Sequence, residues 1–295
     1  MKDSFRMYLY NKLGVQKGII REAKESEMSA KDNLFNPLIE LYYALNQTME
    51  RVPVNIILTD NLNRTHCELR PEYKDKLITE SNALNNDYNG RMVVPHSTDE
   101  TISILINTEK MKQYTDDGSL TWVGTFSHEL THAIDYYQMA RREALTYYDP
   151  LEESASYHMF QLWSEYHARK LGYRLLREFH EGVGNLGEKQ QQIKYITETE
   201  WPFHQNNHYR DYHSGIDGNQ QMYITMQLLG RYSVWCDLFP NTFNEKTLST
   251  VFYHTPWMGH LFSFLRKHES LDIIYSVFDE FRCVLAENWS FVAEE

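Results

Sequence analysis

The chain has 295 residues, a formal net charge of −12 at pH 7, and 42% hydrophobic and 24% charged residues. These proportions are typical of a folded globular protein with a sizeable core. Binding to nucleic acid or to an anionic membrane depends on clustered Lys and Arg, so the acidic balance argues against both partners.

The first part of the chain is expected to form helices followed by a small sheet. Residues 1–50 show apolar side chains at helical spacing. A polar, Asn-rich stretch from Asn61 to Gly90 is expected to be loop with some helix. Three runs rich in β-branched residues, bounded by turn signals, are predicted to be strands. These runs are Val54–Asp60, Arg91–His96 and Thr101–Asn107.

The second part is predicted to be helix and loop only. A long helix is expected just after Ser119. Another is expected from Asp149, a candidate N-cap followed by Pro150, to His180. Residues 181–192 are the best candidate for a linker, and residues 204–218 are expected to be a loop. Further helices are predicted over residues 219–238, 247–267 and 271–288.

The segment Thr121–Ala140 contains the sequence HELTH, in which His128 and His132 lie four residues apart. Residues at this spacing share one face of an α-helix, so both imidazoles can bind one metal ion. Glu129 would flank that ion, where a general base takes a proton from a metal-activated water. The alternative is two histidines on a buried helix that are satisfied by ordinary hydrogen bonds.

The surroundings of this motif resemble the extended signature of the zincin metallopeptidases. Thr125 stands three residues before His128, and apart from the motif itself the positions from Thr125 to Ile134 are uncharged and contain no proline. The order of elements between about residues 54 and 170 is also similar to the zincin layout. The resemblance implies an α+β, predominantly helical fold, with a zincin-like core that has a small sheet before the active-site helix. Residues 1–180 would form this catalytic core. Residues 181–295 would form a helical C-terminal region, either a wall of the cleft or a separate binding domain.

A catalytic zinc site needs a third protein ligand. The metzincin pattern would place a histidine at Gln138 and a glycine at Asp135, so that subfamily is excluded. The remaining resemblance is to gluzincins, in which a glutamate from a following helix completes the site.

Three glutamates compete for this role. Glu152 and Glu153 follow at about the separation seen in thermolysin-like enzymes. Glu152 and Ala155 also form an ExxA pattern, which resembles lethal-factor-like toxins and prophage-repressor-cleaving peptidases. Glu165 and Ala168 repeat that pattern further along, so the shorter spacing alone favours Glu152. Glu152 and Glu165 also have structural interpretations, a capping box and a surface ion pair.

Two supporting roles are expected around the metal. Asp135 lies one helical turn after His132, where it is either a hydrogen-bond acceptor for a ligand imidazole or a surface charge. A donor to the developing oxyanion would come from Tyr209, Tyr212 or His213, and the sequence does not choose among them.

The sequence therefore predicts a zinc-dependent metallopeptidase with one Zn²⁺ per chain, in which Glu129 activates the water and the substrate is a peptide or protein. Two other interpretations stay open: a helical regulatory protein with an incidental HExxH, and a zinc hydrolase acting on a non-protein amide or ester. The three cysteines form no CxxC pair, and there is neither a signal-like segment nor an apolar run that would span a membrane. A cytoplasmic location is expected, and the sequence does not indicate an oligomeric state.

Overall fold

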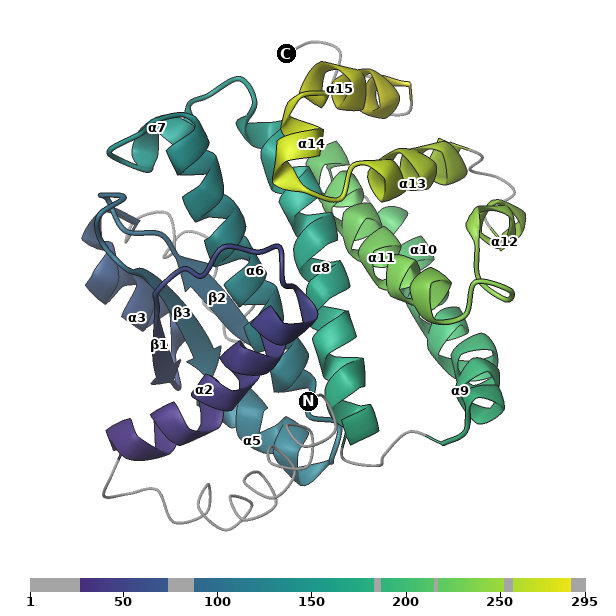
Figure 1. The fold of residues 1–295 in the computed structure, drawn as a ribbon, viewed down its shortest axis with the longest axis horizontal. Coiled ribbons are helices and arrows are strands. Elements are labelled where there is room, and N and C mark those ends of the chain that lie inside the picture. The colour runs from purple at the N-terminus through teal and green to yellow at the C-terminus, as the bar shows by residue number, and fades with distance from the viewer. Residues whose placement is uncertain (1–26, 74–87, 183–186, 215–216, 252–256, 288–295) are drawn as a thin grey trace.

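The computed structural model describes residues 27–73, 88–182, 187–214, 217–251 and 257–287, and these form a small sheet flanked by long helices (Figure 1). The sheet lies at one side, α6 (Thr121–Arg142) packs beside it, and α8 (Tyr157–Gly182) and α11 (Gly218–Leu238) follow in turn. The predicted α+β, predominantly helical class is confirmed.

The sheet has three strands in the order β1 (Val54–Thr59), β3 (Ile102–Asn107) and β2 (Gly90–Val93). β1 runs parallel to β3, and β2 runs antiparallel to it. All six residues of β3 are buried because both of its faces are covered, which explains its continuous apolar run. All three predicted strands are present, although β2 ends before Pro95, whose backbone has no N–H to donate to a strand partner.

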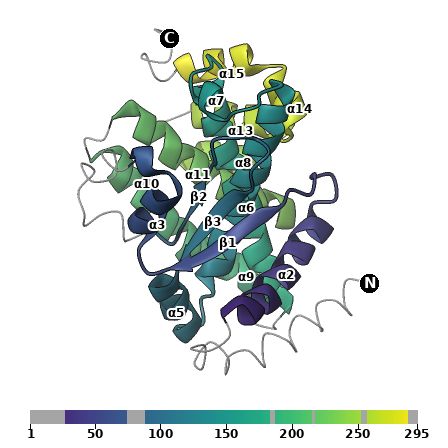
Figure 2. The same cartoon turned by 90° about the vertical axis from the view of Figure 1, so that its left-hand side faces the viewer.

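One face of the sheet packs against α6 and α2 (Glu27–Leu45). The shared core includes Phe35 and Leu38 from α2, Ile104 from β3, and Phe126 and Leu130 from α6. In the view turned by 90°, β1 crosses in front of the other two strands and of α6 (Figure 2). The other face carries α3 (Leu62–Leu69), followed by the short helix Pro71–Tyr73. Residues 1–26 and 74–87, which belong to the predicted N-terminal helices and polar stretch, lie outside the described residues.

The predicted helix from Asp149 to His180 is two helices, α7 (Asp149–Glu152) and α8. Between them the chain makes a turn at Ser154 and Ser156, whose hydroxyls lie 3.3 Å apart. Serine side chains of this kind compete with helical backbone hydrogen bonds. Asp149 is the first residue of α7 and not its N-cap, because its carboxylate binds Arg70 and His96 instead.

α8 runs antiparallel to α6, since Gly172 of α8 lies beside Gly124 and Ser164 lies beside His132. A Cβ atom at Gly172 would lie only 2.7 Å from the Gly124 carbonyl oxygen, so the two glycines allow the helix backbones to approach closely. This close approach brings side chains of the two helices within ligand distance of one another.

The C-terminal part surrounds the other side of α8 with shorter helices (Figure 1). Residues 204–212 of the segment expected to be loop belong to α10 (Trp201–Tyr212). Trp201 and His208 are buried on one face of this helix despite the polar sequence between them. The predicted helix 271–288 is interrupted and forms α14 (Leu271–Tyr275) and α15 (Phe278–Ala286).

The remaining elements are α5 (Thr108–Asp116), α9 (Lys189–Tyr195), the π-helical turn η2 (Ile196–Glu200), α12 (Glu245–Val251) and α13 (Trp257–Lys267). Residues 252–256, within the predicted helix 247–267, and residues 183–186, within the predicted linker, lie outside the described residues.

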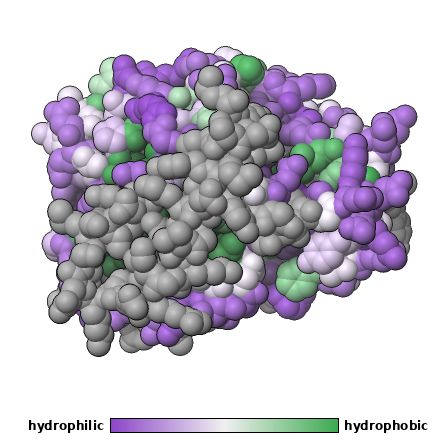
Figure 3. All heavy atoms as spheres, turned by 60° about the horizontal axis from the view of Figure 1, so that its bottom comes forward, coloured by the Kyte–Doolittle hydropathy of each residue, from purple (hydrophilic) through white to green (hydrophobic). Residues whose placement is uncertain are grey.

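A large aromatic core holds this part together, with Trp163 and Tyr166 of α8 packed among Tyr232, Trp235 and other rings. On the face shown in Figure 3, the coloured side chains are mostly hydrophilic, with small separate hydrophobic patches. Cys67, Cys236 and Cys283 form no disulfide. Among the helices of the described residues, none combines the length and the apolar character needed to cross a bilayer.

Candidate metal centre

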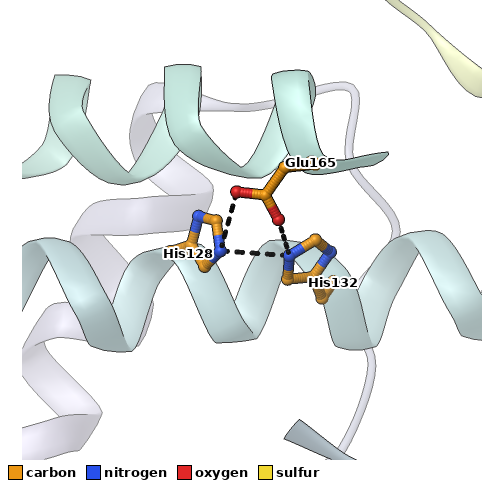
Figure 4. Close-up of side chains that lie close together, drawn as sticks. All are labelled: His128, His132 and Glu165. Atoms are coloured by element: carbon orange, nitrogen blue, oxygen red, sulfur yellow. Dashed lines mark hydrogen bonds and ion pairs between the residues drawn. The ribbon is translucent and has the colours of Figure 1, made fainter. Parts of the chain in front are cut away.

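Three side chains from two helices converge between α6 and α8 (Figure 4). His128 and His132 of α6 direct their Nε2 atoms toward each other at 3.1 Å. Glu165 of α8 places its Oε2 3.2 Å from His132 Nε2 and its Oε1 3.6 Å from His128 Nε2. One ligand atom from each residue lies within 4.8 Å of the others, so the group could hold a metal ion.

The spacing suits a small ion at a common centre. Two ligand atoms about 2.1 Å from a tetrahedral ion lie roughly 3.4 Å apart, close to the separations found here. The Glu165 side chain is only 1% exposed, and its contact with His128 is longer than a hydrogen bond. The three groups thus face one point, where a cation would compensate the buried carboxylate.

The charge states of these three residues depend on one another. Burial lowers the pKa of His128 well below its ordinary value, which keeps a lone pair available on the neutral ring. Burial opposes ionisation of Glu165, but His128, His132 and Arg169 together hold its pKa well below the usual range. Burial also opposes the charge on His132, yet the hydrogen bond and charge of Glu165 raise the pKa of that imidazole. A metal ion would therefore replace a proton shared among these groups.

The glutamate that the structure places beside the histidines is Glu165, whereas the sequence favoured Glu152. Glu152 ends α7 and is exposed, with its carboxylate 3.3 Å from the Tyr73 hydroxyl, and Glu153 is exposed beside it. The reason is the antiparallel packing: His132 lies ten residues before the end of α6 at Arg142. Its partner must therefore lie a similar distance inside the returning helix, and Glu165 lies eight residues after the start of α8.

Glu129 lies beside this group on α6 and contacts the sheet. Its Oε2 accepts a hydrogen bond from the backbone N–H of Met92 in β2 at 2.8 Å. Burial raises the pKa of Glu129. The charge of Glu165 also raises this pKa, whereas His132 lowers it. The residue is half-buried, and the hydrogen bond to the strand fixes one of its carboxylate oxygens.

Asp135 supports the site through an intermediate residue. His132 Nδ1 lies 2.8 Å from Ser164 Oγ, and that hydroxyl donates to Asp135 Oδ2 at 2.8 Å. The fully buried Asp135 also binds His167 Nδ1 at 3.0 Å. Because the Ser164 hydroxyl donates to Asp135, its oxygen can accept a hydrogen bond from His132 Nδ1–H, which leaves Nε2 of that imidazole free to bind a metal ion. Asp135 therefore does not contact the imidazole of His132 directly, because Ser164 lies between them.

Replacing Ser164 with Ala is expected to weaken zinc binding by about tenfold, because His132 loses the acceptor that fixes its tautomer. Competition with a fluorescent zinc chelator measures this affinity. Ser154→Ala, in the turn before α8, is the matched control and should bind zinc as the wild type does. Equal affinity in Ser164→Ala and Ser154→Ala would show that the hydroxyl does not support the ligand.

The expected oxyanion donors lie near the C-terminal end of α10. The Tyr209 ring is 66% exposed and packs against His213 with ring centroids 4.5 Å apart. Tyr212 packs against His208 with centroids 5.5 Å apart. A different tyrosine lies near the site: burial raises the pKa of Tyr223 in α11, and the nearby charge of Glu165 raises it further. No local pattern marks Tyr223, because its position depends on how α11 packs on α8.

A cleft of about 1070 Å³ opens beside His128. It passes between α6 and α8 on one side and η2, α10 and α11 on the other. Its lining includes Thr125, Arg169, Tyr173, Phe203, His204 and Arg231. A long substrate therefore has room to reach the candidate metal group.

Comparison with protein-family models, curated proteins and solved structures finds no match for this chain. The candidate metal group and the cleft beside it therefore carry the functional proposal.

Proposed function

We propose that the protein is a zinc metallopeptidase of the gluzincin type, with one Zn²⁺ held by His128, His132 and Glu165. The observation that carries the proposal is the convergence of a buried carboxylate from α8 on two histidines of α6. Two imidazoles and one glutamate are the ligand set of a class of catalytic zinc sites that keep a fourth position open. Imidazole ligands also favour zinc over calcium or magnesium, which prefer oxygen.

Zinc bound there would supply Lewis acidity, lowering the pKa of a water and polarising a substrate carbonyl. The protein's own contribution begins with Glu129. The Met92 N–H holds one oxygen of that carboxylate, which leaves the other to accept the proton of the attacking water. Because burial raises the pKa of Glu129, the carboxylate is a stronger base than an exposed one. The proton then passes from Glu129 to the leaving amine, and the peptide bond is broken.

Tyr223 is the proposed donor to the oxyanion that develops on the carbonyl. Tyr223 lies close enough to Glu165 for the charge of that carboxylate to raise the pKa of its hydroxyl, and 45% of the residue is exposed. A tyrosine hydroxyl there adds a hydrogen bond that strengthens as negative charge develops. This role replaces the one expected for Tyr209, Tyr212 or His213.

A peptide substrate is supported by the cleft volume of about 1070 Å³, which is at the upper end of the range of small-molecule pockets. Incubating the full chain with a mixture of denatured proteins should give defined fragments by mass spectrometry. Treatment with 1,10-phenanthroline should stop the cleavage, and a stoichiometric amount of Zn²⁺ should restore it. Cleavage that continues unchanged in metal-free protein would contradict the proposal.

A further inference from the structure

The wall of the cleft beside the metal centre is basic, although the chain as a whole carries a net charge of −12. Arg169 and Arg177 of α8 and Arg231 of α11 all line it. The Arg169 and Arg231 side chains are largely buried, with 28% and 20% exposed. Burying a guanidinium is costly unless a carboxylate or similar group pairs with it, so the acidic partners of these arginines decide what the wall can bind.

The acidic partners in the cleft are too few for three arginines. Glu200 of η2 is shared, lying 3.8 Å from Arg177 and 3.7 Å from Arg231. The acid paired with Arg169 is Glu165, at 3.8 Å, which the proposed function assigns to zinc. The Nε atoms of Arg169 and Arg177 are also buried without a hydrogen-bond partner among the described residues. The wall therefore has more guanidinium groups than carboxylates to pair with them, and two of its N–H donors have no partner among the described residues.

Arg169 and Arg231 lie next to each other across the helix interface. A Cβ atom at Gly230, the residue before Arg231, would lie 2.9 Å from the Arg169 Cβ. The positive charges of both arginines also act on His204. Burial lowers the pKa of this histidine, and the charges of Arg231 and Arg169 lower it further, to about 3. Arg169 follows Glu165 by one helical turn, about 6 Å along α8. Arg169, whose Nη2 lies 3.8 Å from Glu165 Oε1, is thus close to a peptide bond placed at the metal, and Arg231 lines the same cleft beside it.

We propose that Arg169 and Arg231 form a carboxylate-binding subsite that selects peptides with a negative charge close to the bond to be cleaved. This inference rests on the proposed function and adds its specificity. Guanidinium groups bind carboxylates through paired, charge-assisted hydrogen bonds, which strengthen in a partly buried cleft. The carboxylate comes either from an Asp or Glu side chain or from the C-terminus of the peptide.

The test measures binding, so that it does not depend on turnover. The Glu129→Gln variant of the full chain is titrated into fluorescein-labelled heptapeptide mixtures, and anisotropy gives the Kd. In the first set, each peptide has one Glu, placed at each position in turn, and an amidated C-terminus. The second set is neutral, because Gln replaces the Glu and the C-terminus is again amidated. The third set has Gln and a free C-terminal carboxylate. We expect about tenfold tighter binding of at least one carboxylate set than of the neutral set.

The set that binds more tightly identifies the source of the carboxylate, a side chain or the C-terminus. Arg231→Gln in the same background should reduce the preference for carboxylate peptides to less than about threefold. Arg231→Lys should keep only part of this preference, because the ammonium group of lysine cannot form the paired hydrogen bonds of a planar guanidinium. Arg174→Gln, which changes an arginine of α8 that lines a different pocket, should keep the preference. Equal affinities for all three sets, or a preference unchanged in Arg231→Gln, would overturn the subsite.

Failure of the subsite and failure of the proposed function are distinguishable. Peptide cleavage that depends on zinc but shows no carboxylate preference overturns only the subsite. A carboxylate preference that Arg231→Gln removes, in a chain that neither holds zinc nor cleaves peptides, overturns only the proposed function.

Discussion

The Glu129→Gln variant is expected to retain its metal and to lose peptide hydrolysis by a factor of at least about 100. Glutamine has nearly the same size and can still accept the hydrogen bond from Met92, so the local structure should be unchanged. Its amide cannot accept the proton of the attacking water, and general-base catalysis is lost. The measurement is kcat/KM on a quenched fluorescent peptide, together with the zinc content of the same sample.

The control for this variant is Glu109→Gln on α5, which removes one negative charge without altering the centre. It should keep wild-type activity. A Glu129→Gln enzyme that retains more than about half of the wild-type kcat/KM would assign the base to another residue.

Replacing Glu165 with Ala is expected to strip the metal from the protein during dialysis. The change removes the carboxylate that, among the described residues, lies within ligand distance of both histidines, and water is a poor replacement for a carboxylate in a buried site. The space left at the α6–α8 interface adds a packing cost. Glu165→Gln, which keeps the volume, should therefore also be measured and should bind zinc far more weakly than the wild type.

The matched controls are Glu152→Ala and Glu153→Ala, because each removes a carboxylate that the shorter spacing placed near the metal. Both residues are exposed, so these variants should keep their zinc. Loss of zinc in Glu152→Ala with full retention in Glu165→Ala would reverse the ligand assignment. The zinc-to-protein ratio after dialysis distinguishes the two results.

The parts of the site that could be predicted are those fixed within one helix. His128 and His132 share a face of α6 because of their spacing alone, and Glu129 follows beside them. The strands were also predictable, since the continuous apolar run of β3 is typical of a strand covered on both faces.

The third member of the metal group could not be derived in the same way. Choosing between Glu152 and Glu165 requires the length of the chain that reverses direction between α6 and α8. The serine-rich turn ends α7 after four residues, so the returning helix begins at Tyr157, later than the sequence suggests. ExxA occurs at both glutamates, and only the antiparallel geometry decides between them.

Side chains from the C-terminal helices were harder still to predict. Tyr223 and Arg231 join the site through the packing of α11 on α8, which Gly230 permits by leaving room for the backbone of Tyr166. The polar segment that forms α10 has few apolar residues, and its helical face becomes evident only when Trp201 and His208 are seen to be buried.

The central claim is that the histidines of α6 and Glu165 hold one zinc ion. Elemental analysis of the purified full chain, after dialysis against metal-free buffer, tests this most directly. The predicted result is one zinc per chain in the wild type and none in the His128→Ala/His132→Ala double variant. A wild-type chain that hydrolyses peptides without bound metal, or a double variant that keeps its full zinc content, would contradict the claim.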